Sequence, residues 1–214
     1  MNRDDVDIIG CKRGWDGYFK LDVYQVRHKR FDGDLSPVLH REILDRGHAV
    51  AVLPYDPLRD EVVLIEQFRP GTLAVQDRQP DMPIWLIEIV AGIIEEGETA
   101  LDVARRETRE ESGCEIIGDL MPISQYYVSP GCSTETVTLY CGRVDAASVG
   151  GLHGVADEGE DIRVFTVPAP DCFAMMARGE ICNAVTIIAL QWLMLNRDRL
   201  RNEAGVLKSQ KLNM

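Results

Sequence analysis

The stretch GIIEEGETALDVARRETREESGC, residues 92–114, decides both the fold and the chemistry that this 214-residue chain can support. Its first part is a glycine-bounded loop, and its second part has the composition of a helix. Thr99 is a good N-cap, with Asp102 three residues later in an arrangement close to a capping box, and Gly113 suits the position just after a helix. The sequence therefore predicts a helix over residues 100–112.

The inward face of the predicted helix carries acids. Residues three or four apart lie on one face of a helix, and here that face comprises Ala100, Val103, Ala104, Glu107, Thr108 and Glu111. Carboxylates about 5 Å apart repel by roughly 3 kcal/mol per pair at an effective dielectric of about 20, so a cation must offset this cost. Arg109 lies two residues from both acids and therefore off their face. Oxygen ligands at this spacing suit a hard divalent ion such as Mg²⁺ or Mn²⁺.

An alternative is that these acids form a solvated face, as acidic runs on helices usually do. Three features favour the inward site: a strand that feeds a glycine-rich turn, a capped helix, and paired acids on the inward stripe. A solvated charge run is not expected to show this agreement between independent signals.

Five strand-like runs indicate a mixed β-sheet beside this helix. They span residues 49–55, 61–68, 85–90, 136–142 and 162–167. Two C-terminal helices follow, with Asp171 as the expected N-cap of the first and Asn183 as that of the second. Residues 70–83 lack periodicity and are expected to form an exposed loop, to which we assign no chemistry. This pattern is typical of an α+β protein.

A small antiparallel β module is expected at the N-terminus. Apolar and polar residues alternate from Phe19 to Tyr24, and after the Asp32-Gly33 turn the chain returns through residues 37–43. A sheet of two or three strands buries too little surface to stand alone. We therefore expect residues 1–46 to lie on the main domain, residues 47–214, or on a second subunit. Dimerisation follows as an inference.

The composition excludes several classes of function. With 23 Lys and Arg against 35 Asp and Glu, the net charge of −12 argues against a nucleic-acid partner. The longest apolar stretch, Thr186–Leu195, is interrupted by Gln191 and is too short to span a bilayer. The acidic N-terminal residues lack the pattern of a secretory signal, so a cytoplasmic location is expected. Six dispersed cysteines without a CxxC pair predict reduced thiols, and four scattered histidines argue against a zinc site.

The segment of residues 92–114 resembles the Nudix box. The seven fixed letters of that motif correspond to Gly92, Glu98, Arg106, Glu107, Glu110, Glu111 and Gly113. Thr108 and Cys114 depart from the pattern, because the family usually has aliphatic residues there. The resemblance implies a Nudix hydrolase with an α/β/α sandwich and a mixed sheet, which uses water and divalent metal to hydrolyse a nucleoside diphosphate linked to another group.

A second feature is similar to the ADP-ribose pyrophosphatase branch of that family. Pro130, in Ser129-Pro130-Gly131, follows the box by sixteen residues, as in that branch, although Pro-Gly is also a common turn pair. The stretches GHAVAVLPYDPLRDEVVLIEQFRPG and NAVTIIALQWL also resemble counterparts there. The resemblance implies a domain-swapped homodimer that hydrolyses ADP-ribose to AMP and ribose 5-phosphate.

The resemblance also implies a set of metal ligands and catalytic residues. Two or three Mg²⁺ or Mn²⁺ ions per site would be held by the backbone carbonyl of Ala91 and by the carboxylates of Glu107, Glu111 and Glu160. Arg106 would hold neighbouring carboxylates in place, among them those of Glu98 and Glu110. Glu158, on the acidic loop of residues 156–161, would act as the general base. Without the resemblance, such a loop is usually only solvated.

Substrate contacts are implied at four positions. Tyr18 resembles an aromatic residue that stacks on adenine, Arg41 and Arg69 resemble arginines that contact the base or the phosphates, and Glu135 resembles a residue near the terminal ribose. Packing on the sheet is an alternative role for Tyr18. Since Tyr18 and Arg41 belong to the N-terminal module, a swapped dimer would place them in the site of the partner.

Two rival functions remain at this stage. GDP-mannose or another nucleotide sugar is an alternative substrate, against which Pro130 is the discriminating feature. A catalytically silent Nudix domain that senses nucleotides is a rival from another class. Such a sensor is expected to have lost metal carboxylates or gained a DNA-binding extension, and neither change is seen here.

Overall fold

The chain divides into two compact units in the computed structural model, which describes the fold of residues 1–212 and the side chains of residues 1–206. The first unit comprises Met1–Ala49 together with Gln125–Val137. The second unit comprises Val50–Ser124 and the chain from Thr138 onwards. The first unit thus contains the expected N-terminal module and a distant segment of the chain. The predicted boundary between residues 1–46 and 47–214, and the inability of residues 1–46 to fold alone, stay predictions.

A three-stranded antiparallel sheet forms most of the first unit. Its elements are η1 (Arg3–Asp5), β1 (Val6–Asp16), β2 (Lys20–His28) and β3 (Leu39–Asp45), and the strand order is β1-β2-β3. The expected hairpin is confirmed, because β2 pairs with β3 from Lys20 opposite Asp45 to Val26 opposite Leu39. The first strand was not predicted, since its sequence, VDIIGCKRGWD, does not alternate cleanly. Its pairing with β2 has two register shifts.

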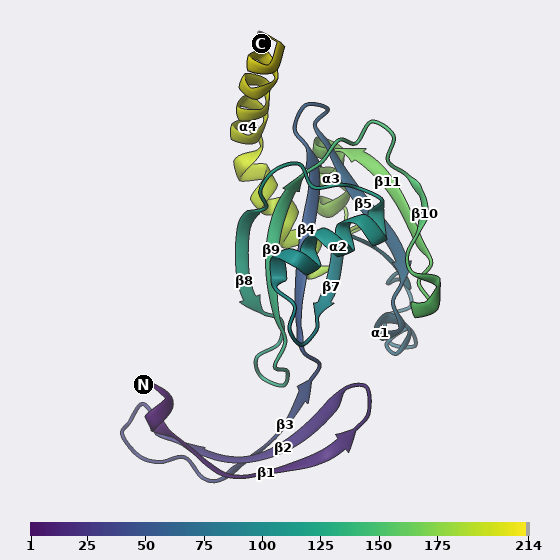
Figure 1. The fold of residues 1–214 in the computed structure, drawn as a ribbon. Coiled ribbons are helices and arrows are strands. Elements are labelled where there is room, and N and C mark those ends of the chain that lie inside the picture. Colours follow the sequence, from purple (N-terminus) through teal and green to yellow (C-terminus); the bar gives the residue numbers. More distant parts are fainter. Residues whose placement is uncertain (213–214) are drawn as a thin grey trace. The chain divides into compact units, whose positions relative to one another are not determined.

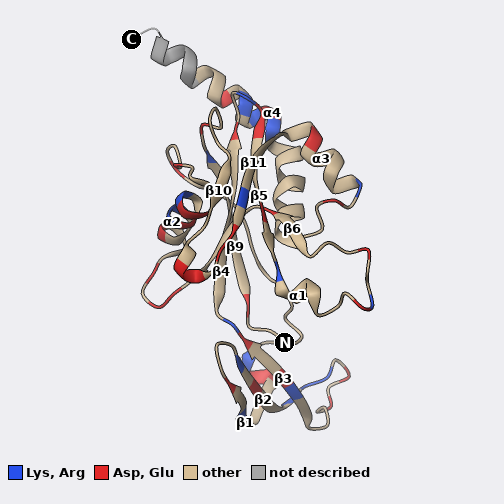
Figure 2. Cartoon of the chain, turned by 90° about the vertical axis from the view of Figure 1, so that its right-hand side faces the viewer, with Lys and Arg blue, Asp and Glu red and all other residues tan. Residues whose placement is uncertain are grey.

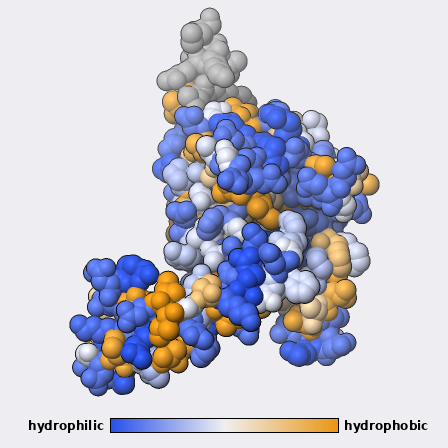
Figure 3. Space-filling view, turned by 60° about the horizontal axis from the view of Figure 1, so that its bottom comes forward, coloured by the Kyte–Doolittle hydropathy of each residue, from blue (hydrophilic) through white to orange (hydrophobic). Residues whose placement is uncertain are grey.

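None of the residues in these three strands is buried. Large apolar side chains of this unit are exposed, including Trp15 at 67%, Tyr18 at 85% and Phe31 at 98%. Figure 3 shows the resulting hydrophobic surface. A sheet that buries so little of its apolar surface within its own unit has little to stabilise it alone.

A larger mixed sheet carries the second unit (Figure 1). Its strands are β4 (His48–Asp56), β5 (Glu61–Phe68), β6 (Trp85–Glu88), β7 (Val90–Ile94), β8 (Met121–Tyr127), β9 (Thr136–Arg143), β10 (Gly151–His153) and β11 (Ile162–Pro168). The order is β10-β11-β5-β4-β9-β8, while β6 pairs with β5 and β7 pairs with β4.

Helices cover both faces of this sheet. They are α1 (Pro70–Leu73), α2 (Ala100–Ser112), η2 (Ala156–Glu158), α3 (Ala169–Ala177) and α4 (Ala184–Leu212). Figure 2 shows α2 on one side of the sheet and α3 with α4 on the other. The predicted α/β/α sandwich of class α+β is therefore confirmed. In the part of the chain that the structure describes, no helix has the length and apolar character needed to cross a membrane.

Apolar residues of the sheet form a continuous core under α2. Val52, Val63 and Ile65 from the central strands are fully buried there, as are Val103 and Ala104 from the helix. Their β-branched side chains favour the extended strands that carry them. Burial of this apolar surface fixes α2 on the sheet and thereby fixes every side chain that projects from its inner face.

Three details differ from the expectations. The predicted strand 85–90 is two strands, because the backbone N–H of Ile89 donates to Thr186 Oγ1 at 3.1 Å, and the chain passes there from β5 to β4. Helix α3 begins at Ala169, so Asp171 lies in its first turn and its prediction as N-cap is wrong. Residues 70–83 are not a plain loop, since they begin with the short helix α1.

Asp60 joins the β4–β5 turn to helix α4. It accepts hydrogen bonds from Tyr55 Oη at 2.7 Å and Arg197 Nε at 2.8 Å, and Arg201 Nη1 lies 3.3 Å from Oδ2. Desolvation would raise the pKa of Asp60, but the hydrogen bonds from Arg197 and Tyr55 outweigh it and hold the pKa below its ordinary value. Its backbone φ of 64° is in the left-handed region, which Asn and Asp tolerate better than Ala.

Asp60→Ala should lower the free energy of unfolding by about 2 to 4 kcal/mol, because it removes the hydrogen-bond acceptor of Tyr55 and Arg197 and strains the turn. Asp60→Asn, which tolerates the same φ, is the matched control and should lose less. Because the folded pKa of Asp60 is depressed, its stabilisation is present at pH 7 and is lost as the pH falls through the pKa values of the unfolded and then the folded state. Denaturant unfolding at pH 7 and pH 3 measures both effects. Equal stability of all three proteins at pH 7 would contradict this assignment.

Candidate active site

Helix α2 is held at both ends by the predicted caps. The backbone N–H of Asp102 donates to Thr99 Oγ1 at 3.2 Å, so Thr99 is the N-cap. Gly113 follows the helix with a φ of 68°, and its N–H donates to the carbonyl of Arg109. Glycine adopts this left-handed conformation without steric cost. Because both ends are fixed and the inner face is packed, the side chains of α2 have defined positions.

Glu111 is a buried carboxylate on the inner face of α2. It is 2% exposed, and its Oε2 accepts a hydrogen bond from the backbone N–H of Ala91 at 2.8 Å. Desolvation raises the pKa of Glu111 to about 8 against the opposing effect of the Ala91 N–H. The charges of Glu107 and Glu160 raise it further, and that of Arg69 lowers it. The pKa of Glu111 therefore depends on the Ala91 N–H and on the charges of Glu107, Glu160 and Arg69.

Glu107 lies one turn before Glu111 and against the chain at Gly92. A Cβ atom at Gly92 would lie 2.0 Å from Glu107 Oε1, so only glycine leaves room for this carboxylate. Desolvation raises the pKa of Glu107 to about 7, although the charge of Arg106 lowers it. Two neighbouring acids with raised pKa values form an unusual site, because removing carboxylates from water is costly.

Arg106 connects the acids of the segment. Its Nη1 lies 2.9 Å from Glu107 Oε1 and 2.9 Å from Glu110 Oε2, and its Nε lies 3.4 Å from Glu98 Oε1. Glu98 in turn accepts from the backbone N–H of Glu95 at 3.1 Å. Figure 2 shows the acidic and basic residues together on α2. The contact with Glu110 is also a hydrogen bond, and ion pairs of this kind restrict the rotamers of the acids they join.

The two departures from the box pattern fit the packing. Thr108 is fully buried, and its hydroxyl donates to the carbonyl of Ala104 at 2.6 Å, so its polar atom is satisfied within the helix. Cys114 is 4% exposed and packs in the core under α2 as a small apolar residue. Neither change disturbs the acids.

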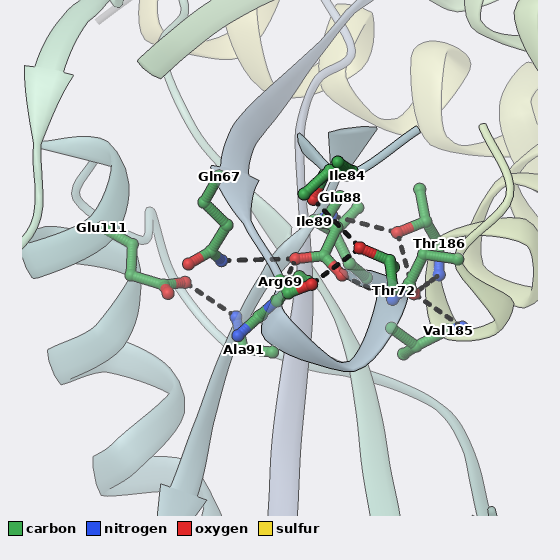
Figure 4. A network of polar contacts seen from close by, with 11 residues as sticks. Gln67, Arg69, Thr72, Ile84, Glu88, Ile89, Ala91, Glu111, Val185 and Thr186 are labelled. Atoms are coloured by element: carbon green, nitrogen blue, oxygen red, sulfur yellow. Dashed lines mark hydrogen bonds and ion pairs between the residues drawn. The ribbon is translucent and has the colours of Figure 1, made fainter. Parts of the chain in front are cut away.

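Arg69 lies at the end of β5 above a second buried acid. Its Nε donates to Glu88 Oε2 at 2.8 Å, and Glu88 is 3% exposed (Figure 4). Gln67 and Asn183 also donate to Glu88. Desolvation raises the pKa of Glu88, although Arg69 opposes the shift. Sequence reasoning missed this acid, although an ionisable residue inside the apolar run WLIEIV was a usable signal.

The acidic loop before β11 carries Glu158 and Glu160. Glu158 ends η2 and is exposed. Glu160 is half-buried, and its Oε2 accepts from the backbone N–H of Val155 at 2.9 Å. Since Glu160 raises the pKa values of Glu107 and Glu111, its charge acts on the acids of α2. The roles of Glu158 and Glu160 stay predictions.

The remaining predicted substrate residues belong to the first unit. Tyr18 packs edge-to-face on Phe19 with 4.8 Å between ring centroids, and Arg41 is exposed. Glu135 is 8% exposed, and its carboxylate lies 3.2 Å from Arg46 Nη1. Their contacts with substrate stay predictions.

The fold and the site together define an α+β protein with an acidic, oxygen-donor site on the helix that follows a glycine turn. The chain belongs to the Nudix family, since the model of the NUDIX domain matches residues 45–178. ADP-ribose pyrophosphatase of Escherichia coli (strain K12) is 47% identical to it over 203 residues, which cover 95% of this chain and 94% of that protein.

Two further proteins are similar to this chain. GDP-mannose pyrophosphatase of Shigella flexneri serotype 5b is 32% identical over 195 residues, which cover 89% of this chain and 96% of that protein. A crystal structure of an ADP compounds hydrolase superimposes with a TM-score of 0.67 at 17% identity, covering 92% of this chain and 97% of the other. This last likeness concerns the fold alone.

Gly92→Ala should lower the rate of nucleoside diphosphate hydrolysis by roughly 100-fold or more, because the new methyl group must displace the carboxylate of Glu107. The clash involves the end of a flexible side chain, so the melting temperature should change little. Gly71→Ala is the matched control, since an added Cβ meets nothing there within 4 Å. Steady-state kinetics and thermal unfolding of both variants test this. Full activity of Gly92→Ala would mean that the position of Glu107 is unimportant.

Proposed function

We propose that this protein hydrolyses the diphosphate of ADP-ribose to AMP and ribose 5-phosphate. The observation that carries the proposal is the buried Glu111 with the half-buried Glu107 one turn before it, beside Gly92, in a chain 47% identical to an ADP-ribose pyrophosphatase. The intact acids argue against a silent nucleotide sensor. One water is consumed, and one phosphorus–oxygen bond of the diphosphate is broken.

The acids of α2 suit a divalent metal, which we propose to be Mg²⁺ or Mn²⁺ in two or three ions per site. Their donors are oxygens, and their raised pKa values reflect burial that a cation would offset. Among the side chains that the structure describes, no three His, Cys, Asp or Glu residues are gathered as a preformed metal site. The proposed ligands are those that the family resemblance implies, namely Glu107, Glu111 and Glu160 with the carbonyl of Ala91. Bound metal would neutralise the diphosphate and lower the pKa of the attacking water.

The protein's own groups are proposed to do three things. Glu158 accepts a proton from the water as it attacks phosphorus, which an exposed carboxylate on a loop before β11 can do once substrate is bound. Arg106 restricts Glu107 through its ion pair with that carboxylate. Arg69 donates to the diphosphate and offsets the negative charge that the substrate brings to a chain of net charge −12.

Recognition of the adenosine and ribose parts is proposed for the first unit. Tyr18 is 85% exposed, which leaves its ring free to stack on adenine, and Arg41 is exposed on β3. Glu135 is proposed to lie near the terminal ribose. The exposed apolar surface of the small sheet supports a domain-swapped homodimer in which each first unit completes the site of the partner. We also propose a cytoplasmic location.

A panel of substrates tests the activity. With Mg²⁺ present, kcat/KM for ADP-ribose should exceed that for GDP-mannose, because the identity of 47% to an ADP-ribose pyrophosphatase exceeds the 32% to a GDP-mannose pyrophosphatase. Phosphate release coupled to a phosphatase measures both, and EDTA should abolish turnover. Preference for GDP-mannose would select the alternative substrate, and full turnover in EDTA would contradict metal dependence.

Metal and pH should act together on stability. Because the folded pKa values of Glu107 and Glu111 are raised above their ordinary value, the metal-free protein should lose stability as the pH rises from about 5 to about 8, when these acids ionise in the folded state. Mg²⁺ should raise the melting temperature more at pH 8 than at pH 6. Glu111→Gln should flatten the pH dependence and reduce the effect of Mg²⁺. Calorimetry of both proteins at both pH values measures this, and an identical pH dependence would refute it.

Complementation tests the shared site. Arg41→Ala and Glu111→Gln should each lower activity strongly, and heterodimers of the two should have one intact site. Mixing the variants under conditions that exchange subunits should therefore raise activity above that of either parent, towards about a quarter of wild type. Mass spectrometry verifies the exchange. Silent mixtures despite verified exchange, or a fully active monomer, would show that each site is built within one chain.

A further inference from the structure

Glu88 is a buried acid with three side-chain donors, two from the end of β5 and one from the start of α4. Arg69 Nε lies 2.8 Å from its Oε2, and Gln67 Nε2 lies 3.3 Å from the same oxygen (Figure 4). Asn183 Nδ2 lies 2.5 Å from Oε1. The carboxylate is 3% exposed, so its orientation is set by these contacts rather than by water. A buried carboxylate with both oxygens engaged is a rigid acceptor.

Asn183 fixes that carboxylate from the start of helix α4. Its Oδ1 accepts from the backbone N–H groups of Val185 and Thr186 at 3.1 and 3.3 Å, and its Nδ2 donates to Glu88. The two ends of the amide therefore have opposite hydrogen-bonding roles, which determines its orientation. Thr186 also accepts from the backbone N–H of Ile89, next to Glu88. The first turn of α4 thus orders the strand that carries the acid.

Arg69 is held at both its backbone and its Nε. Its backbone N–H donates to the carbonyl of Ile84 at 3.1 Å, and its carbonyl accepts from Thr72 Oγ1 at 2.7 Å. Among the described residues, its two terminal nitrogens donate to no acceptor, and its side chain is 41% exposed. The Glu88 contact therefore leaves the terminal N–H groups of the guanidinium available. Glu88, which holds Arg69, lies three residues before Ala91, whose backbone N–H donates to Glu111 at 2.8 Å (Figure 4).

We propose that Glu88 and Asn183 are positioning residues that hold the guanidinium of Arg69 in place to bind the diphosphate of the substrate. Glu88 fixes the guanidinium through Nε, and Asn183 fixes Glu88. The inference rests on the proposed function, because it assigns the terminal nitrogens of Arg69 to the phosphate oxygens. A fixed guanidinium binds these oxygens without losing side-chain entropy at that step, so the network should contribute mainly to substrate affinity.

A double-mutant cycle separates this role from a purely structural one. Glu88→Gln keeps the shape of the side chain and removes the charge, and should raise KM for ADP-ribose about 10-fold to 100-fold with a smaller change in kcat. In the Arg69→Ala background the same change should alter KM by less than about 2-fold, because there is no guanidinium left to position. Equal factors in the two backgrounds, or no effect of Arg69→Ala, would overturn the proposal.

Two further variants keep the test decisive. Asn183→Ser retains an oxygen that can cap α4 and removes the donor to Glu88, so it should raise KM in the same direction and lose its effect in the Arg69→Ala background. Glu66→Gln is the matched control, because Glu66 lies on the same strand and pairs with Arg163 on β11, outside the proposed site. Its KM should stay within about 2-fold of wild type, and a rise as large as that of Glu88→Gln would overturn the proposal.

Binding gives an activity-free readout. The dissociation constant of α,β-methylene-ADP-ribose, measured by titration calorimetry with Mg²⁺, should rise with Glu88→Gln by the same factor as KM, and an unchanged constant would overturn the proposal. Failure of the proposed function is separate, since it would appear as a wild-type protein without ADP-ribose turnover. The same cycle on GDP-mannose would then decide the role of Glu88 by the same criteria.

Discussion

Burial of Glu111 on the inner face of α2 is the constraint to which the rest of the site is fitted. An ionised carboxylate that is 2% exposed is costly, and desolvation raises its pKa to about 8. The helix is capped at both ends and packed on a valine-rich sheet, so the acid cannot turn to solvent. The N–H of Ala91 satisfies one oxygen, and Gly92 leaves room for Glu107 beside it. The cost of ionising Glu111 in this buried position remains, and a bound divalent cation would offset it.

Helix α4, on the face of the sheet opposite α2, contacts the chain just before Ala91. The first turn of α4 supplies Thr186 to the backbone of Ile89 and Asn183 to Glu88. The resulting break between β6 and β7 lets the chain pair first with β5 and then with β4, so that Glu88 and Ala91 lie on either side of it. Local breaks in a ladder often occur beside functional residues, where they redirect side chains.

Local signals made much of the fold predictable from the sequence. Thr99 and Gly113 mark the two ends of α2, Asn183 caps α4, and apolar runs mark the central strands. Each of these signals depends only on neighbours within a few residues. The break at Ile89 and the network around Glu88 were not predictable in this way, since Thr186 and Asn183 are nearly 100 residues away in sequence. The acids of α2 were found because helical spacing alone places them together. The roles of Tyr18, Arg41 and Glu158 come from the family resemblance and stay predictions.

Proton release on metal binding tests the central claim most directly, namely that Glu107 and Glu111 of α2 hold the metal of a pyrophosphatase. Titration calorimetry with Mn²⁺ at pH 7, in two buffers of different ionisation enthalpy, counts the protons released. Since the pKa values of Glu107 and Glu111 are about 7 and about 8, binding should release on the order of one proton. Glu111→Gln should reduce both the release and the affinity. Heats that are independent of the buffer, or equal affinity in the variant, would contradict the account.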